Sequence, residues 1–235
     1  MKSWRYPDIM RVEVSVMPIQ TVLAASLRSP HTRKLWWWVV AAAPAIVLFD
    51  YLAVSPIGSD VFLWFKMIFV FGCFAALLGV VVLPFFLIFK KWRKATVAWL
   101  LLSVCFLAAS LVGFVVGNNV RKMAFEGLAE RSMVLVEAVH SYEETKGYPP
   151  ESLVDLVPEY IDAVPSTGMM AYPEYRYSVG EDAKYFSGNP WVLRVPAPSG
   201  GINFDEFLYF PLQNYPASGY GGQLVKVGKW AYSRE

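Results

Sequence analysis

Residues 96–117 read TVAWLLLSVCFLAASLVGFVVG, an apolar run of 22 residues that contains no charged side chain. A helix of about 20 apolar residues is long enough to cross the hydrocarbon core of a bilayer. The run therefore predicts a transmembrane helix. It also divides the chain into a membrane region before residue 118 and a water-soluble region after it.

The helix predicted at 96–117 is expected to continue into water as far as Lys146. Apolar side chains within 118–146 recur at spacings of three, four and seven, which is typical of one helix face. The stripe consists of Phe125, Leu128, Leu135, Val139 and Tyr142, with Ser132 in its remaining position. Gly147 and the pair Pro149–Pro150 then end the helix, which spans about 50 residues in all.

Two further apolar segments precede this helix, at about 35–54 and 61–89. The first begins with Trp36, Trp37 and Trp38, where an aromatic belt belongs. The second is longer than a bilayer requires, so it is expected to tilt, to protrude or to kink at Pro84. Residues 55–60 form a short turn between them, in which Asp60 is placed to cap the next helix.

The distribution of charge predicts an orientation in the membrane. Residues 1–117 carry a net charge of +7 and residues 118–235 a net charge of −5, which together make the total of +2. The N-terminal tail and the loop KKWRK at 90–94 are basic, whereas the loop at 55–60 has no positive charge. Basic loops stay cytoplasmic. We therefore expect a multi-pass protein of the bacterial inner membrane, with a cytoplasmic N-terminus and residues 118–235 in the periplasm.

Residues 1–34 form a basic cytoplasmic segment before the three-helix region at 35–117. Within it Ile19, Val22, Leu23 and Leu27 fall at helical spacing, which indicates an amphipathic helix on the membrane surface. The alternatives are a disordered tail or a true start at Met10.

The expected extracytoplasmic domain at 118–235 is of the α+β class. Besides the long helix it contains a short helical segment at Ser152–Val157 and four strand-like runs at Glu174–Val179, Trp191–Val195, Glu206–Leu212 and Gln223–Tyr232. The helix stripe must be covered, so we expect it to pack on the sheet. The expected partners are Tyr177, Val192 and Leu208, with Phe207 and Tyr209 as the alternative strand face.

Residues 147–165 read GYPPESLVDLVPEYIDAVP, with Tyr175-Arg176-Tyr177 beyond them. A helix that runs into such a segment resembles type IV pilin and type II secretion pseudopilin domains. The resemblance rests on Gly147, Tyr148, Pro149, Leu153, Leu156, Val157, Pro158, Tyr160, Ile161, Val164 and Pro165. It implies a long helix, half in the membrane, packed on an antiparallel sheet.

The sequence also departs from the pilin pattern. Pilins have one N-terminal apolar segment, which follows a prepilin peptidase site and carries a glutamate near its start. Here two apolar segments come before the candidate helix, no such site precedes Thr96, and residues 96–117 contain no acidic residue. We therefore do not expect the chain to be cleaved and polymerised into a filament.

Two charged residues, Asp50 and Lys66, lie inside the apolar segments. Antiparallel packing across the turn at 55–60 would bring them to a similar depth, where they could pair. Intramembrane charges mark functional sites by default. The alternatives are a structural ion pair, or two side chains that reach to the interface.

We expect structural roles for the other candidate residues. Cys73 and Cys105 lie in apolar runs and are expected to be buried thiols. His140 has no Cys or His partner at i±3 or i±4; Glu137, Glu143 and Glu144 are near it, but a metal site would need more than this, and a solvated helix face is favoured. An oxygen-rich turn at Asp205 and Glu206 could hold calcium, but an ordinary hairpin turn is favoured. We expect no catalytic constellation, metal site or cofactor.

These patterns favour a non-catalytic, membrane-anchored protein whose pilin-like domain binds an envelope protein partner, as in assembly or secretion. The expected partners are thus the lipid bilayer and a protein, and not nucleic acid, because the soluble half is acidic. Aromatic crowding at Phe207, Tyr209, Phe210, Tyr215 and Tyr220 fits sheet packing or a partner surface. The alternative function is an envelope enzyme or small-molecule sensor with a pocket in the C-terminal domain.

Overall fold

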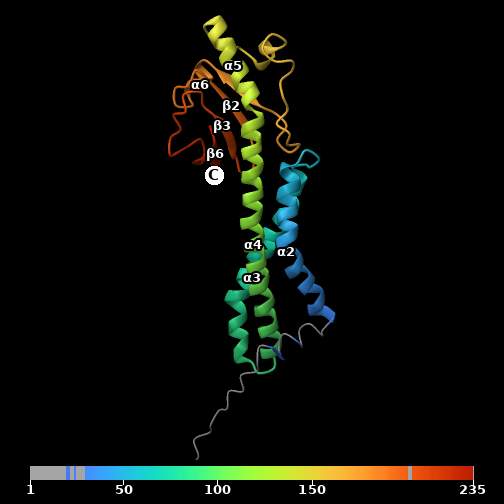
Figure 1. The fold of residues 1–235 in the computed structure, drawn as a ribbon. Helices are drawn as coiled ribbons and strands as arrows, with labels where there is room; N and C mark the ends of the chain where they lie inside the picture. The colour runs from blue at the N-terminus through green and yellow to red at the C-terminus, as the bar shows by residue number, and fades with distance from the viewer. Residues whose placement is uncertain (1–19, 22–23, 25–29, 201–202, 235) are drawn as a thin grey trace, which may run out of the picture.

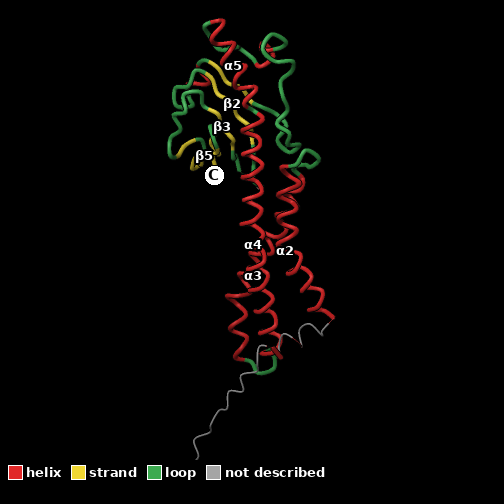
Figure 2. The backbone as a smooth tube through the Cα atoms, viewed as in Figure 1, coloured by secondary structure: helices red, strands yellow, loops and turns green. Residues whose placement is uncertain are grey.

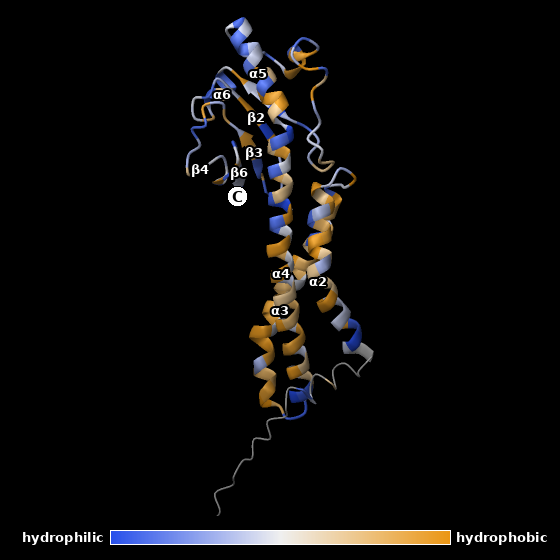
Figure 3. Cartoon of the chain, viewed as in Figure 1, coloured by the Kyte–Doolittle hydropathy of each residue, from blue (hydrophilic) through white to orange (hydrophobic). Residues whose placement is uncertain are grey.

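The computed structural model describes residues 20–21, 24, 30–200 and 203–234. Its first half contains three long apolar helices: α2 at Pro30–Val54, α3 at Val61–Val82, and α4 at Arg93–Arg131 (Figure 1). Each is long and apolar enough to cross a membrane, and together they form the apolar half of the molecule (Figure 3). The amphipathic segment expected around Ile19 to Leu27 lies largely outside the described residues.

The second apolar segment does not remain α-helical to its end. Helix α3 gives way at Leu83 to the 3-10 helix η1 at Leu83–Ile88. Pro84 lies in the first turn of η1 and has no N–H to donate, which accounts for the change at this point. At the start of α3, Asp60 makes no side-chain capping bond, so the cap expected from it is wrong; the Val61 N–H donates to Ser59 Oγ instead (3.3 Å).

The long third helix continues into the C-terminal half with a single interruption. Helix α4 ends at Arg131 and α5 begins at Met133 and runs to Lys146. At the junction the buried Ser132 hydroxyl donates to Leu128 O (2.6 Å), four residues back. Gly147 then ends α5 in the left-handed conformation (φ 83°), with its N–H donating to Glu143 O.

The C-terminal half adds a six-stranded antiparallel sheet of order β1-β2-β3-β6-β5-β4. The strands are β1 Arg176–Val179, β2 Trp191–Pro196, β3 Glu206–Tyr209, β4 Ser218–Gly219, β5 Gly222–Val227 and β6 Trp230–Arg234. Two short helices accompany them: η2 at Leu153–Leu156, as expected, and α6 at Glu181–Lys184. The single strand expected at 223–232 is wrong, because Gly228 turns the chain (φ 60°) and separates β5 from β6.

The α4–α5 helix packs along one face of the sheet (Figure 2). The Phe125 ring stacks on Phe207 of β3 at 5.1 Å between centroids. Leu128, Leu135 and Val139 are buried in the same core. The expected partners Val192 and Leu208 are wrong, because they lie in a smaller cluster on the other face with Phe210; the alternative set of Phe207 and Tyr209 faces the helix.

Close contact between α2 and α4 depends on small residues. A Cβ added to Gly113 would lie 2.9 Å from Ala43 Cα, so the two backbones approach each other too closely for a side chain. Helix α2 contains Pro44 near this crossing. The part of α2 before Pro44 leans away from α3 and α4 (Figure 1).

Candidate functional site

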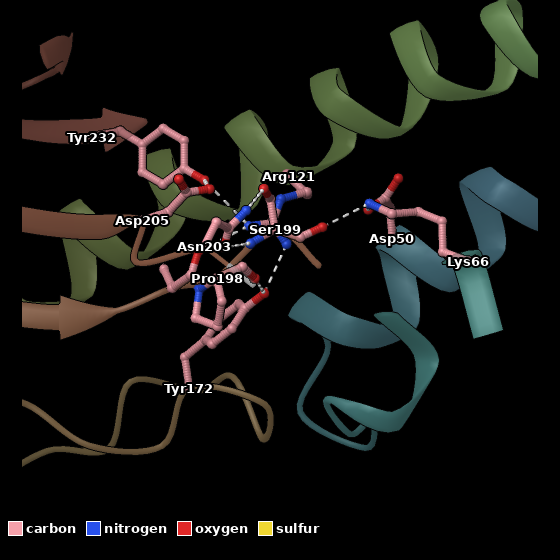
Figure 4. Close-up of polar contacts among 10 residues, drawn as sticks. Asp50, Lys66, Arg121, Tyr172, Pro198, Ser199, Asn203, Asp205 and Tyr232 are labelled. Carbon is pink, nitrogen blue, oxygen red and sulfur yellow. Dashed lines mark hydrogen bonds and ion pairs between the residues drawn. The ribbon is translucent and has the colours of Figure 1, made fainter. Parts of the chain in front are cut away.

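A buried polar cluster joins the three long helices to the sheet (Figure 4). At its helical end, Lys66 Nζ of α3 lies 2.7 Å from Asp50 Oδ1 of α2. Both side chains are almost completely buried, with 2% of Asp50 and 9% of Lys66 exposed. The structure thus brings together the two charges that the sequence singled out.

Residues from other elements complete the surroundings of this ion pair. On α4, Gly117 faces Asp50, and a side chain there would overlap the carboxylate. From the loop after β2, the Ser199 carbonyl accepts a hydrogen bond from Lys66 Nζ (3.0 Å). The ammonium therefore contacts both a neighbouring helix and the sheet domain.

Arg121 of α4 forms the centre of the cluster and is 3% exposed. One terminal nitrogen donates to the Tyr172 hydroxyl (2.7 Å), and the other donates to the Ala197 carbonyl (3.2 Å). The second nitrogen also lies 3.5 Å from the Tyr232 hydroxyl. The guanidinium lies over the rings of Phe125 and Tyr172, at 5.5 and 5.6 Å from their centroids.

Two tyrosines extend the cluster from Arg121 into the domain. Tyr232 of β6 donates its hydroxyl proton to Asp205 Oδ2 (2.6 Å), and Tyr172 donates to Pro198 O (2.6 Å). Burial raises the pKa of both tyrosines, so they remain neutral donors. The four charged members, Asp50, Lys66, Arg121 and Asp205, balance in sign.

Ser199 and Asn203, both in the connection between β2 and β3, are hydrogen-bonded to each other. Asn203 Oδ1 accepts from the Ser199 N–H (3.1 Å), and Asn203 Nδ2 donates to Ser199 Oγ (2.7 Å). This bracing presents the Ser199 carbonyl to Lys66. A buried charge that lacks partners is costly, but each charge here is paired or hydrogen-bonded. The arrangement is therefore suited to fixing the domain on the helices.

The other candidate residues, which could in principle bind a metal ion or act as thiols, do not form a second polar site among the described residues. The described part of the chain contains no group of three or more His, Cys, Asp or Glu side chains placed to hold a metal ion. Asp205 and Glu206 lie where the hairpin connection between the antiparallel strands β2 and β3 ends, as expected; Asp205 is buried and accepts from Tyr232, and Glu206 pairs with Arg194 (3.2 Å). His140 is only partly exposed, because its ring packs edge-on against Trp191 (5.2 Å). Cys73 and Cys105 are free thiols and are partly rather than fully buried in this chain.

The residues of the pilin-like motif lie apart from the polar cluster, at the far end of α5. Leu156 is fully buried there, and Tyr160 packs against Tyr142 at 5.3 Å between ring centroids. The Val157–Pro158 peptide bond is cis. The other motif residues, Gly147, Tyr148, Pro149, Leu153 and Pro165, lie in the same α5–η2 segment and the chain that follows it.

Sequence reasoning missed most of the cluster. Arg121 lies four residues before Phe125 and seven before Leu128, on the apolar stripe itself, which was the signal that it is buried. Tyr172, Asp205 and Tyr232 come from distant parts of the chain and carry no local signal. Of the crowded aromatics, Phe207 and Tyr209 pack under the helix, and Phe210, Tyr215 and Tyr220 pack on the opposite face.

Two pockets of the described residues are lined by helix residues alone, with no residue of the sheet domain in either wall. The larger, of about 750 Å³, lies among α2, α3 and α4. No family model, curated protein or solved structure matches this chain.

Proposed function

We propose that the chain is a non-catalytic, membrane-anchored protein that holds an α+β domain in a fixed orientation for a protein partner. The buried cluster of Asp50, Lys66, Arg121 and Asp205 carries this proposal. It joins three helices to the sheet domain by hydrogen bonds and an ion pair. These four buried charges have their partners only while the domain stays docked on the helices, so free movement of the domain would leave them unpaired.

The helices are proposed to cross the bacterial inner membrane, with the N-terminus in the cytoplasm and residues 118–235 in the periplasm. The basic residues 90–94 at one end and the uncharged turn at 55–58 at the other support this orientation. Alkaline phosphatase fused after Glu235 is expected to be active, and a fusion after Lys94 inactive. The reverse pattern would overturn the orientation.

The resemblance to pilin and pseudopilin domains extends this proposal to a role in an envelope assembly or secretion system. Its support is the long α4–α5 helix packed across an antiparallel sheet. The two apolar helices that precede α4 distinguish the chain from a filament subunit. We therefore propose an accessory that remains in the membrane.

The outer face of the sheet, opposite the helix, is the proposed contact surface. Tyr185, next to α6, is 75% exposed and packs edge-on against Tyr220 (5.8 Å). Exposed tyrosines are favoured in protein interfaces because they offer a large, rigid, amphipathic contact.

A photo-crosslinking amino acid at position 185 of the full chain, in intact cells, tests this surface. We expect a discrete protein adduct at this position. The same amino acid at Tyr51, an exposed position on α2, serves as the control and is expected to yield none. Identical adducts at both positions, or no protein adduct at position 185, would contradict the proposal.

A further inference from the structure

The cavity among α2, α3 and α4 is an apolar groove on the basic side of the molecule. Its wall includes Leu35 and Trp38 of α2, Val82 of α3, and Trp99 and Ser103 of α4. Ser103 is the one side chain with a polar oxygen in this wall. At about 750 Å³ the cavity falls in the size range of small-molecule sites.

Two features of the helices create the groove. The wall of α3 includes Gly72 and Gly79, where an added Cβ would lie 2.9 Å from Phe106 and 3.1 Å from Ser103, so these glycines let α3 and α4 pack closely. The part of α2 before Pro44 leans away from α3 and α4 (Figure 1). The groove therefore lies between the closely packed helices α3 and α4 and the diverging part of α2.

A cluster of exposed cations lies at the same end of the helices as the groove. Leu35 and Trp99 of the wall follow Lys34 and Lys94 within about a turn and a half. The cations are Arg33, Lys34, Lys90, Lys91, Arg93 and Lys94. The sequence has no Asp or Glu within 14–49 or 61–125 to neutralise them. Among the described residues, the cations at this end of the groove therefore have no acidic side chain near them along the helices.

We propose that the groove binds one anionic phospholipid, with an acyl chain between α2 and α3 and the phosphate at the cationic cluster. This inference rests on the proposed membrane location. Basic pockets between membrane helices are the usual binding sites for anionic lipid headgroups. A second copy of the chain fits less well, because it would bring the same six cations to the same level.

Binding of defined lipids to the purified full chain tests the site. Native mass spectrometry would compare phosphatidylglycerol with phosphatidylcholine of the same acyl chains. We expect phosphatidylglycerol to bind roughly tenfold more tightly. Replacing both Lys34 and Lys94 by Gln should reduce this preference while leaving phosphatidylcholine binding unchanged. Equal binding of the two lipids to the wild-type chain would overturn the proposal.

A matched pair of substitutions tests the slot itself. Ala75→Phe places a ring in the groove, whereas Ala108→Phe places the same ring at an exposed position on α4 outside it. The first should abolish retention of the lipid and the second should not. Wild-type binding by Ala75→Phe would overturn the proposal.

Two further experiments distinguish failure of the lipid-site proposal from failure of the proposed membrane location. If disulfide crosslinking at Ala75→Cys, with Cys73 and Cys105 replaced by Ser, joined two chains efficiently, a second copy would occupy the groove and the lipid site would be excluded. If alkaline carbonate released the chain from membranes, the proposed membrane location would fail. If the chain stays in the membrane but shows no lipid preference, the proposed lipid site is wrong and the proposed membrane location still stands.

Discussion

Gly117 of α4 lies directly against the carboxylate of Asp50 on α2, in contact so close that a methyl group would overlap Oδ2. Because Asp50 also accepts from Lys66 Nζ at 2.7 Å, the glycine keeps open the space in which the ion pair forms. The position of one backbone atom on α4 therefore determines whether a charge on α2 and a charge on α3 can meet.

Gly117→Ala is expected to destabilise the chain, although alanine favours a helix over glycine by about 1 kcal/mol. The methyl group would displace Asp50 and disturb the ion pair. Gly127→Ala is the control, because its methyl group would meet only the flexible end of Arg131 (3.1 Å). Thermal unfolding in detergent should show a lower midpoint for the first variant and an equal or higher midpoint for the second. Equal behaviour would mean that the Gly117 contact is unimportant.

Removal of one member of the buried ion pair should cost more than removal of both. Asp50→Asn or Lys66→Met alone leaves a buried charge without its partner, which costs about 3–5 kcal/mol. The double variant should be more stable than the worse of the two single variants. The exposed Lys122–Glu126 pair (3.9 Å) is the control, and its loss should change the free energy of unfolding by about 0.5 kcal/mol or less. Additive losses at Asp50 and Lys66 would contradict their coupling.

Two tyrosine-to-phenylalanine changes should have opposite consequences. The Tyr232 hydroxyl donates to Asp205, so Tyr232→Phe is expected to cost about 1–3 kcal/mol. The Tyr177 hydroxyl is buried without a hydrogen-bond partner, so Tyr177→Phe is expected to be neutral or stabilising. Chemical denaturation of the two full-length variants would check this, and a greater loss for Tyr177→Phe would count against the cluster.

Alkaline pH should unfold the domain. Burial raises the pKa of Tyr177, Tyr215 and Tyr232 above the ordinary value of about 10. Their neutral forms are favoured in the folded state, so this stability is fully present below about pH 10 and is lost as the pH rises further. Tyrosinate absorbance and circular dichroism should therefore change together. Ionisation of these tyrosines in a domain that stays folded would disprove the expectation.

The helix stripe provides a fifth test. Leu135 is fully buried between α5 and the sheet, and Leu135→Ala should cost about 2–5 kcal/mol. Glu137→Ala and Glu144→Ala, at exposed positions of the same helix, should each change stability by about 0.5 kcal/mol or less. If all three variants were equally destabilised, the helix would not be the core of the domain.

Features that depend on local pattern were predictable from the sequence. Apolar length located the three long helices, and the stripe from Phe125 to Val139 predicted that the third continues into the domain. The choice of sheet face was not predictable, because Phe207 and Tyr209 are as apolar as their neighbours Leu208 and Phe210, and both faces of the sheet bury side chains. The turn at Gly228 was hidden within a continuous strand-like run.

Some members of the polar cluster were predictable from the sequence and others were not. Asp50 and Lys66 were evident because a charge in an apolar run is rare. Arg121 was missed, although it lies on the apolar stripe, because its neighbours Asn119 and Lys122 made that stretch of helix resemble a solvated surface. Asp205 and Tyr232 became partners only through the pairing of β3 with β6, which is a long-range property of the fold.

Strand β6 comes last along the chain but lies between β3 and β5 in the sheet. While the ribosome is still making residues 230–234, β3 has an open edge and the β4–β5 hairpin has nothing to join. Phe207, which stacks on Trp230 at 4.9 Å, lacks that cover for the same interval. Folding therefore cannot proceed strand by strand behind synthesis.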